Sequence, residues 1–208
     1  MSHCLRRWRS ILLIAVLVVA PCSLRAINLS LTNQDIERAL RIGRGSEKER
    51  AAFHAGYIHE LQDTTVRQIE VVTEFRRLVL KTEERGRLGD WMFSQGVRAA
   101  QEALRPSRGR LTLIVQLQFD PMNTYLQVPP FVLLVGETPD VTPLNAQITP
   151  LSSLPFQTRG GQTTTYLTGA TLESEFEAAA IAQMERPVSV FLGGKELVRV
   201  PINFRRLE

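Results

Sequence analysis

Residues 111–119 read LTLIVQLQF, and this stretch decides the fold class. Every second residue in it is apolar: Leu111, Leu113, Val115, Leu117 and Phe119. Thr112, Gln116 and Gln118 lie among the positions between them. A period of two predicts a β-strand with one face buried and the other partly exposed to water.

The pattern of the chain changes at this strand. Residues 106–110 (PSRGR) form a short linker before it. Upstream, apolar residues recur mostly at helical spacing, and downstream mostly at a spacing of two. Charge changes at the same place, since residues 27–110 hold 15 basic and 12 acidic side chains and residues 111–208 hold only 6 and 9. We therefore expect a helical N-terminal part and a β-rich C-terminal part.

Two capping patterns predict short helices near the start of the first part. Thr32 or the residue after it is suited to cap a helix that ends at about Ile42. Ser46 and Glu49 have the spacing of a capping box, which predicts a second short helix through Ala55.

Residues 65–85 admit two interpretations. Val71, Phe75, Leu78 and Val79 fall on one face of a helix. The β-branched residues over 64–72 instead favour a long strand. We expect the helix. After it, Asp90 is predicted to cap a further helix that Pro106 stops and in which four apolar residues repeat at helical spacing: Phe93, Val97, Ala100 and Leu104.

The second part is predicted to continue as strands. Residues 120–123 have turn composition, so 125–128 should return antiparallel to the first strand. The apolar run 131–135 predicts a strand covered on both faces. Residues 137–168 are rich in Thr, Pro, Gly and Ser and should hold at most one or two strands.

The last third of the chain has the same strand patterns. Residues 171–177 alternate and predict a strand with a charged outer face of Glu173, Glu175 and Glu177, although a helix over 171–182 stays open. The alternation around 193–194 (Gly-Gly) predicts a terminal hairpin. Since Pro201 has no N–H to donate, its strand should be an edge strand of the sheet.

Helices that come first and strands that come later predict an α+β fold. The expected architecture is a helical N-terminal part over 27–110, followed by a mainly antiparallel β-sheet or β-sandwich over 111–208. We expect the two parts to pack together as one domain.

Residues 1–26 have the three regions of a cleavable export signal. A basic start precedes the apolar run 11–20, and a polar stretch ends in Ala26. The run would span about 15 Å as a helix, half of a bilayer core, so we expect no membrane anchor in the mature chain. Cleavage near Ala26 would release a periplasmic or extracellular protein, and Cys22 leaves a lipoprotein signal as an alternative.

Removal of this signal changes the charge and the redox chemistry. Four of the 25 basic residues and none of the 21 acidic residues lie within 1–26, which leaves 21 of each. Hence no excess of positive charge predicts a nucleic-acid partner. Cys4 and Cys22 are also removed, so the mature chain has no thiol for a disulfide, a nucleophile or a metal ligand.

Few residues suggest chemistry, and no cofactor is implied. His54, His59 and Glu60 are the candidate catalytic residues, but their spacing does not match a zinc motif, so we expect no metal site. Trp91 is the candidate binding residue, with a place in the core as the alternative.

These observations predict a non-enzymatic exported protein that acts by binding or assembly. Its partner would be a macromolecule of the cell envelope or the extracellular space. The alternative is a hydrolase of envelope or extracellular polymers that uses carboxylates and a histidine.

Overall fold

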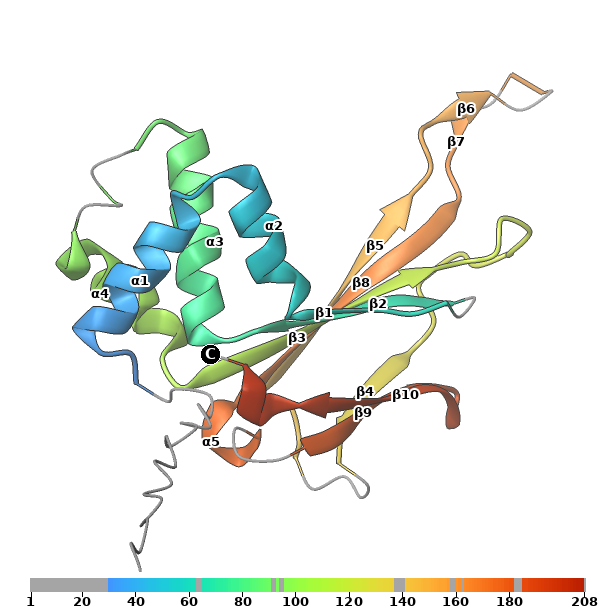
Figure 1. Cartoon of the computed structure of the whole chain (residues 1–208). Helices are drawn as coiled ribbons and strands as arrows, with labels where there is room; N and C mark the ends of the chain where they lie inside the picture. Colours follow the sequence, from blue (N-terminus) through green and yellow to red (C-terminus); the bar gives the residue numbers. More distant parts are fainter. Residues whose placement is uncertain are drawn as a thin grey trace, which may run out of the picture.

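A computed structural model describes residues 30–62, 65–90, 93, 96–136, 141–157, 160–161, 163–181 and 185–207. It has the α+β fold that the sequence predicts, with helices mostly in the first half and strands mostly in the second (Figure 1). The helices of four residues or more are α1 (Asn33–Gly43), α2 (Glu47–Ala55), α3 (Glu74–Arg87), α4 (Val97–Leu104) and α5 (Ala178–Ile181).

The strands form antiparallel sheets. Their bounds are β1 (Ile58–Glu60), β2 (Val66–Val72), β3 (Arg110–Gln118), β4 (Phe131–Val135), β5 (Asn145–Ser152), β6 (Phe156–Gln157), β7 (Thr163–Thr164), β8 (Leu167–Glu177), β9 (Glu185–Leu192) and β10 (Lys195–Asn203). A five-stranded sheet has the order β1-β2-β3-β8-β5, and a three-stranded sheet has the order β10-β9-β4. The short strands β6 and β7 pair with each other beyond the ends of β5 and β8.

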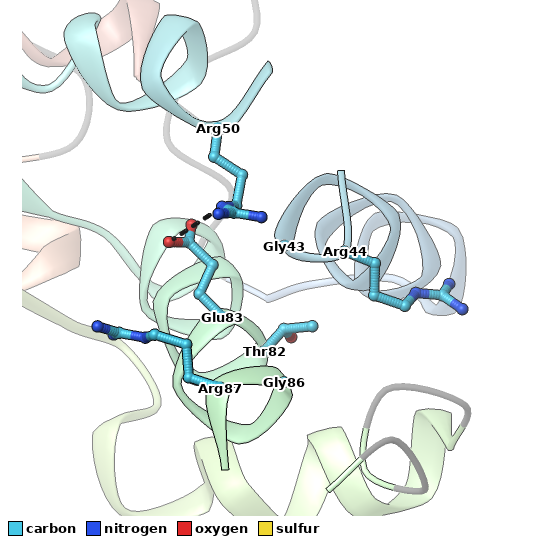
Figure 2. Close-up of a pocket in the computed structure, with 7 residues that line it drawn as sticks. All are labelled: Gly43, Arg44, Arg50, Thr82, Glu83, Gly86 and Arg87. Carbon is cyan, nitrogen blue, oxygen red and sulfur yellow. Dashed lines mark ion pairs between the residues drawn. The ribbon is translucent and has the colours of Figure 1, made fainter. Parts of the chain in front are cut away.

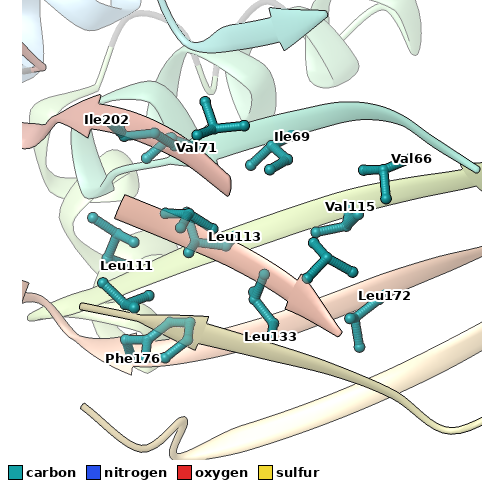
Figure 3. Packing of buried hydrophobic residues seen from close by; sticks show 14 of the residues in the cluster. Val66, Ile69, Val71, Leu111, Leu113, Val115, Leu133, Leu172, Phe176 and Ile202 are labelled. Carbon is teal, nitrogen blue, oxygen red and sulfur yellow. The ribbon is translucent and has the colours of Figure 1, made fainter. Parts of the chain in front are cut away.

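The main core lies between the two larger sheets. Leu113, Val115 and Leu172 of the five-stranded sheet are in one buried cluster with Leu133 and Ile202 of the smaller sheet (Figure 3). A second cluster joins α1, α3 and α4 on the other side of the five-stranded sheet, where the helices cover only one end of it (Figure 1). This arrangement leaves the far ends of β3, β5 and β8 without helical cover.

Several local predictions are confirmed. The Thr32 side chain caps α1, and Ser46 and Glu49 form the capping box of α2. Residues 171–177 belong to β8, which lies inside the sheet, and β9 and β10 form the terminal hairpin. Pro201 lies in β10, an edge strand.

The helix predicted over 65–85 is wrong in its first half. Residues 66–72 form β2, and α3 begins only at Glu74. Val66, Ile69 and Val71 are fully buried in the sheet core, and the strand that the β-branched residues over 64–72 favour is the one that forms. Thr73 then accepts a hydrogen bond from the Arg76 amide at 3.2 Å and caps α3.

The further helix predicted from Asp90 begins later than expected. Asp90 accepts a hydrogen bond from the Phe93 amide at 3.2 Å, but α4 starts at Val97 after Gly96. Asp90 therefore does not cap α4.

Three strand predictions also need correction. Residues 125–128 form no strand, because the side chains of Asp120 and Asn123 accept hydrogen bonds from loop amides at 2.7 and 3.0 Å and hold an irregular loop. Strand β4 is not covered on both faces, since Val132 is half exposed. Residues 141–157 and 163–164 hold three strands, β5 to β7, rather than one or two.

Candidate functional site

A chain of charged and polar groups joins α2, β2 and α3. Its centre is Arg76, whose side chain is 2% exposed. The Arg76 guanidinium lies 2.7 Å from a Glu70 carboxylate oxygen and donates to the Val71 carbonyl at 2.6 Å. It also lies over the Tyr57 ring, with 5.1 Å from Cζ to the ring centroid. Burial lowers the pKa of Arg76, and the Glu70 carboxylate opposes that shift.

His54 continues the chain from Arg76. Arg76 donates from Nε to His54 Nδ1 at 3.2 Å, so Nδ1 must be an acceptor. The other ring nitrogen, Nε2, then carries the proton and donates to Glu83 Oε1 at 2.6 Å. Since both ring nitrogens are held by neighbouring side chains, His54 has no free nitrogen to act as a general base.

Glu83 forms one wall of a cavity of about 200 Å³ beside the helices (Figure 2). Its second carboxylate oxygen lies 3.5 Å from Arg50 Nε. Gly43 and Thr82 also line this cavity, where α1 and α3 approach so closely that a Cβ on Gly43 would lie 2.6 Å from Thr82 Cβ. Arg50 and Glu83, which face the cavity, are paired with each other, and this pairing indicates a structural role.

The structure does not bring the three candidate catalytic residues together. Glu60 and His54 line one groove between α2 and β1, with a volume of about 470 Å³. His59 lies between Ile58 and Glu60 on β1 and pairs with the buried Ile69, so its side chain points to the opposite face of the sheet. Its Nε2 atom is buried, has no hydrogen-bond partner among the described residues, and burial lowers the pKa of this imidazole.

Among the described residues, the remaining sequence candidates form no second site. Trp91, the candidate binding residue, lies outside the described residues. Within the described part of the chain, no three His, Cys, Asp or Glu side chains group as metal ligands. None of the helices described there is long and apolar enough to cross a membrane.

A surface that the sequence did not single out lies at the end of the sheet away from the helices. Strands β5 and β8 extend beyond the body and continue into β6 and β7, which makes a projecting arm (Figure 1). Large apolar side chains on this arm and on the neighbouring β3–β4 loop are exposed. We call them the distal apolar surface: Met122, Tyr125, Leu126, Leu151, Leu154, Phe156 and Tyr166.

Hydrogen bonds hold the loop against the arm. Asn123 Nδ2 donates to the Leu167 carbonyl at 3.0 Å. Across the arm, the Ser153 amide donates to the Tyr166 carbonyl at 2.8 Å, and the rings of Phe156 and Tyr166 meet edge to face at 5.9 Å. Leu151 and Phe156 thus lie on paired strands and the Tyr166 backbone is paired with Ser153, whereas Met122, Tyr125 and Leu126 lie on the loop.

One signal in the sequence could have located this surface. Across residues 121–172 the only charged side chains are Glu137, Asp140 and Arg159, whereas 22% of the whole chain is charged. Exposed β-structure is ordinarily protected by charge, so a long segment with few charges and scattered apolar residues indicates a contact surface.

Comparisons of this chain with known protein families, with curated proteins and with solved structures find no match.

Proposed function

We propose that this chain is an exported binding protein that docks onto a partner protein of the cell envelope or the extracellular space through its distal apolar surface. The observation that carries the proposal is that seven exposed large apolar side chains lie on the arm and on the β3–β4 loop, in a part of the chain with few charged residues. Large apolar side chains that stay exposed in one region of a fold are typical of a place where a partner docks.

The composition of the surface supports a protein partner. Tyr125, Phe156 and Tyr166 offer aromatic rings, and such rings with flanking aliphatic side chains are enriched at the centres of protein interfaces. The arm projects from the body, so a partner can reach both of its faces (Figure 1). Both ring nitrogens of His54 are hydrogen-bonded to neighbouring side chains, which favours a binding protein over a hydrolase that uses this histidine.

The test compares capture of envelope proteins by three forms of the purified chain. Leu154→Ser combined with Phe156→Ser removes apolar surface from the arm, and Leu88→Ser removes another exposed leucine, at the end of α3, as a control. We expect wild type and Leu88→Ser to retain the same crosslinked partner and the arm variant to lose it. Equal capture by all three forms would refute the proposal.

A second assay tests whether the distal apolar surface binds lipid instead of a protein. The same three forms are mixed with protein-free vesicles and sedimented. Retention of wild type and loss of the arm variant in this assay would show that lipid occupies the surface, and the protein-partner proposal would then be wrong.

Export is the other half of the proposal. Cleavage near Ala26 should give a natural protein whose first residue is Ile27, and N-terminal sequencing of material from the envelope or the medium checks this. A protein that keeps Met1 and stays in the cytoplasm would contradict it.

A further inference from the structure

The two free edges of the five-stranded sheet differ in what they can pair with. In antiparallel ladders, residues alternate between those whose N–H and C=O point to the neighbouring strand and those whose groups point away. On β1, the Val71 amide donates to the Tyr57 carbonyl and the Leu61 amide donates to the Arg67 carbonyl, each at 2.9 Å. Residues 57, 59 and 61 therefore face β2, and the N–H and C=O groups of Ile58 and Glu60 point outward.

The edge at β5 is blocked by a proline. The Phe119 amide donates to the Thr168 carbonyl, so even-numbered residues of β8 face β3 and odd-numbered residues face β5. Thr149 pairs with Thr171 and faces β8, which leaves Pro150 facing outward, where its missing N–H interrupts any further strand. Strand addition is therefore disfavoured at β5 and open at β1.

A groove runs beside the open edge. Helix α2 leads directly into β1 (Figure 1), and the space between them is the groove of about 470 Å³ lined by Ala51, His54, Ala55, Ile58 and Glu60. The helix presents two alanines there, so the backbone of another chain can come close to it. The strand presents Ile58 and Glu60, the same residues whose backbone groups point outward.

The charge of the groove selects the occupant. Glu60 is exposed and has no ion-pair partner among the described residues, and no Lys or Arg lines the groove. His54 in the groove wall already donates to Glu83 and accepts from Arg76. A ligand that carries a cation opposite Glu60 would meet an unpaired carboxylate.

We propose that the groove between α2 and β1 binds an extended peptide segment of a partner protein as an added antiparallel strand, with an apolar side chain beside Ile58 and a Lys or Arg opposite Glu60. The peptide would exchange backbone hydrogen bonds with Ile58 and Glu60, as in other cases of strand addition. This site stands apart from the distal apolar surface and does not depend on the partner bound there.

The test begins with random peptides as the probe, so that no partner has to be identified first. Phage that display random seven-residue peptides are selected on the wild-type chain after counter-selection on Ala51→Trp, which fills the groove from an exposed helix position. We expect the enriched peptides to alternate β-favouring residues with Lys or Arg. Failure to enrich any sequence over the blocked variant would overturn the proposal.

An enriched peptide is then synthesised and measured on the folded chain. It should shift the amide resonances of Ile58 and Glu60, and its affinity should fall at least tenfold for Glu60→Lys. The matched control Glu173→Lys, an exposed glutamate of β8, should bind as wild type does. Methylation of the peptide nitrogens that face β1 should abolish binding, because it removes the ladder donors. Resonance shifts confined to other strands, unchanged affinity for Glu60→Lys or full binding of the methylated peptide would overturn the proposal.

Discussion

Arg76 Nε donates to His54 Nδ1 at 3.2 Å, and this contact orients an imidazole 22 positions earlier in the chain. The arginine is protonated at any pH of interest, so the histidine can only accept at that nitrogen. Its remaining proton is thereby directed to Glu83 on α3. One buried guanidinium thus couples α2 to α3 and, through Glu70, to β2.

Replacement of the Arg76 guanidinium should lower the free energy of unfolding. Arg76→Met leaves the Glu70 carboxylate, the Val71 carbonyl and His54 Nδ1 without their donor, and we expect a loss of about 3–5 kcal/mol of unfolding free energy. Urea denaturation measures it. Arg85→Met on the same helix is the control, because Arg85 is half exposed and its pair with Asp90 should contribute at most about 1 kcal/mol. Equal losses in the two variants would contradict a central role for Arg76.

Gly169 allows β8 to lie against β3 at the base of the arm. A Cβ at this position would lie 2.2 Å from the Leu117 carbonyl oxygen, closer than atoms can approach. Gly169→Ala should therefore destabilise the fold by roughly 1–3 kcal/mol, as overpacking does. Gly56→Ala is the matched control, since its Cβ would meet only the Phe53 carbonyl at 3.7 Å. Thermal melting of both variants checks the difference, and a Gly169→Ala variant as stable as wild type would exclude the clash.

His59 should make the fold sensitive to mild acid. Burial lowers the pKa of His59 in the folded chain below its ordinary value of 6.5, so below that value the unfolded chain binds the proton first. The contribution of neutral His59 to the free energy of unfolding is therefore complete above pH 6.5 and is lost as the pH falls toward the lowered pKa. His59→Leu removes this proton uptake and the unpaired Nε2, so it should lose less stability than wild type between pH 7.5 and 5.5 in urea titrations. An equal loss in both proteins would show that His59 is not the group responsible.

Glu74 should change the pH dependence of folding stability in the direction opposite to that of His59. Burial raises the pKa of the Glu74 carboxyl above its ordinary 4.5, although the Gly109 amide and the Arg108 and Arg77 charges oppose the shift. The folded chain then keeps a proton that the unfolded chain has lost, and stability falls as pH rises from 4.5 through the raised pKa. The stability of Glu74→Gln relative to wild type should therefore increase from pH 4 to pH 7. Parallel stability curves for the two proteins over this range would contradict the raised pKa.

Predictions that rest on neighbours in the sequence agree best with the structure. The caps of α1 and α2 join residues three apart, so Thr32 and Asp35, or Ser46 and Glu49, meet wherever the helix lies. The region 66–72 shows where local patterns no longer decide between a helix and a strand. Val71 shares helical spacing with residues of α3, whereas the β-branched residues over 64–72 favour a strand, and the pairing of β2 with β3 selects the strand.

The candidate site could likewise be predicted only in part. His54 and Glu60 could be chosen from the sequence because few other side chains suggest chemistry, and the structure does place both in one groove. Their surroundings could not be predicted. The partners of His54 are 22 and 29 positions away, and the direction of His59 depends on its pairing with Ile69.

The sequence by itself determined the α+β order, the helix caps, the strand at 111–119 and the shortage of charge over 121–172, because each of these depends on local spacing or composition. The tertiary structure decided which edge of the sheet is open and which is blocked by Pro150, which apolar residues stay exposed, and which groups Arg76 joins. Those features depend on contacts between residues far apart in the chain, and such contacts are fixed only when the strands pair and the helices pack.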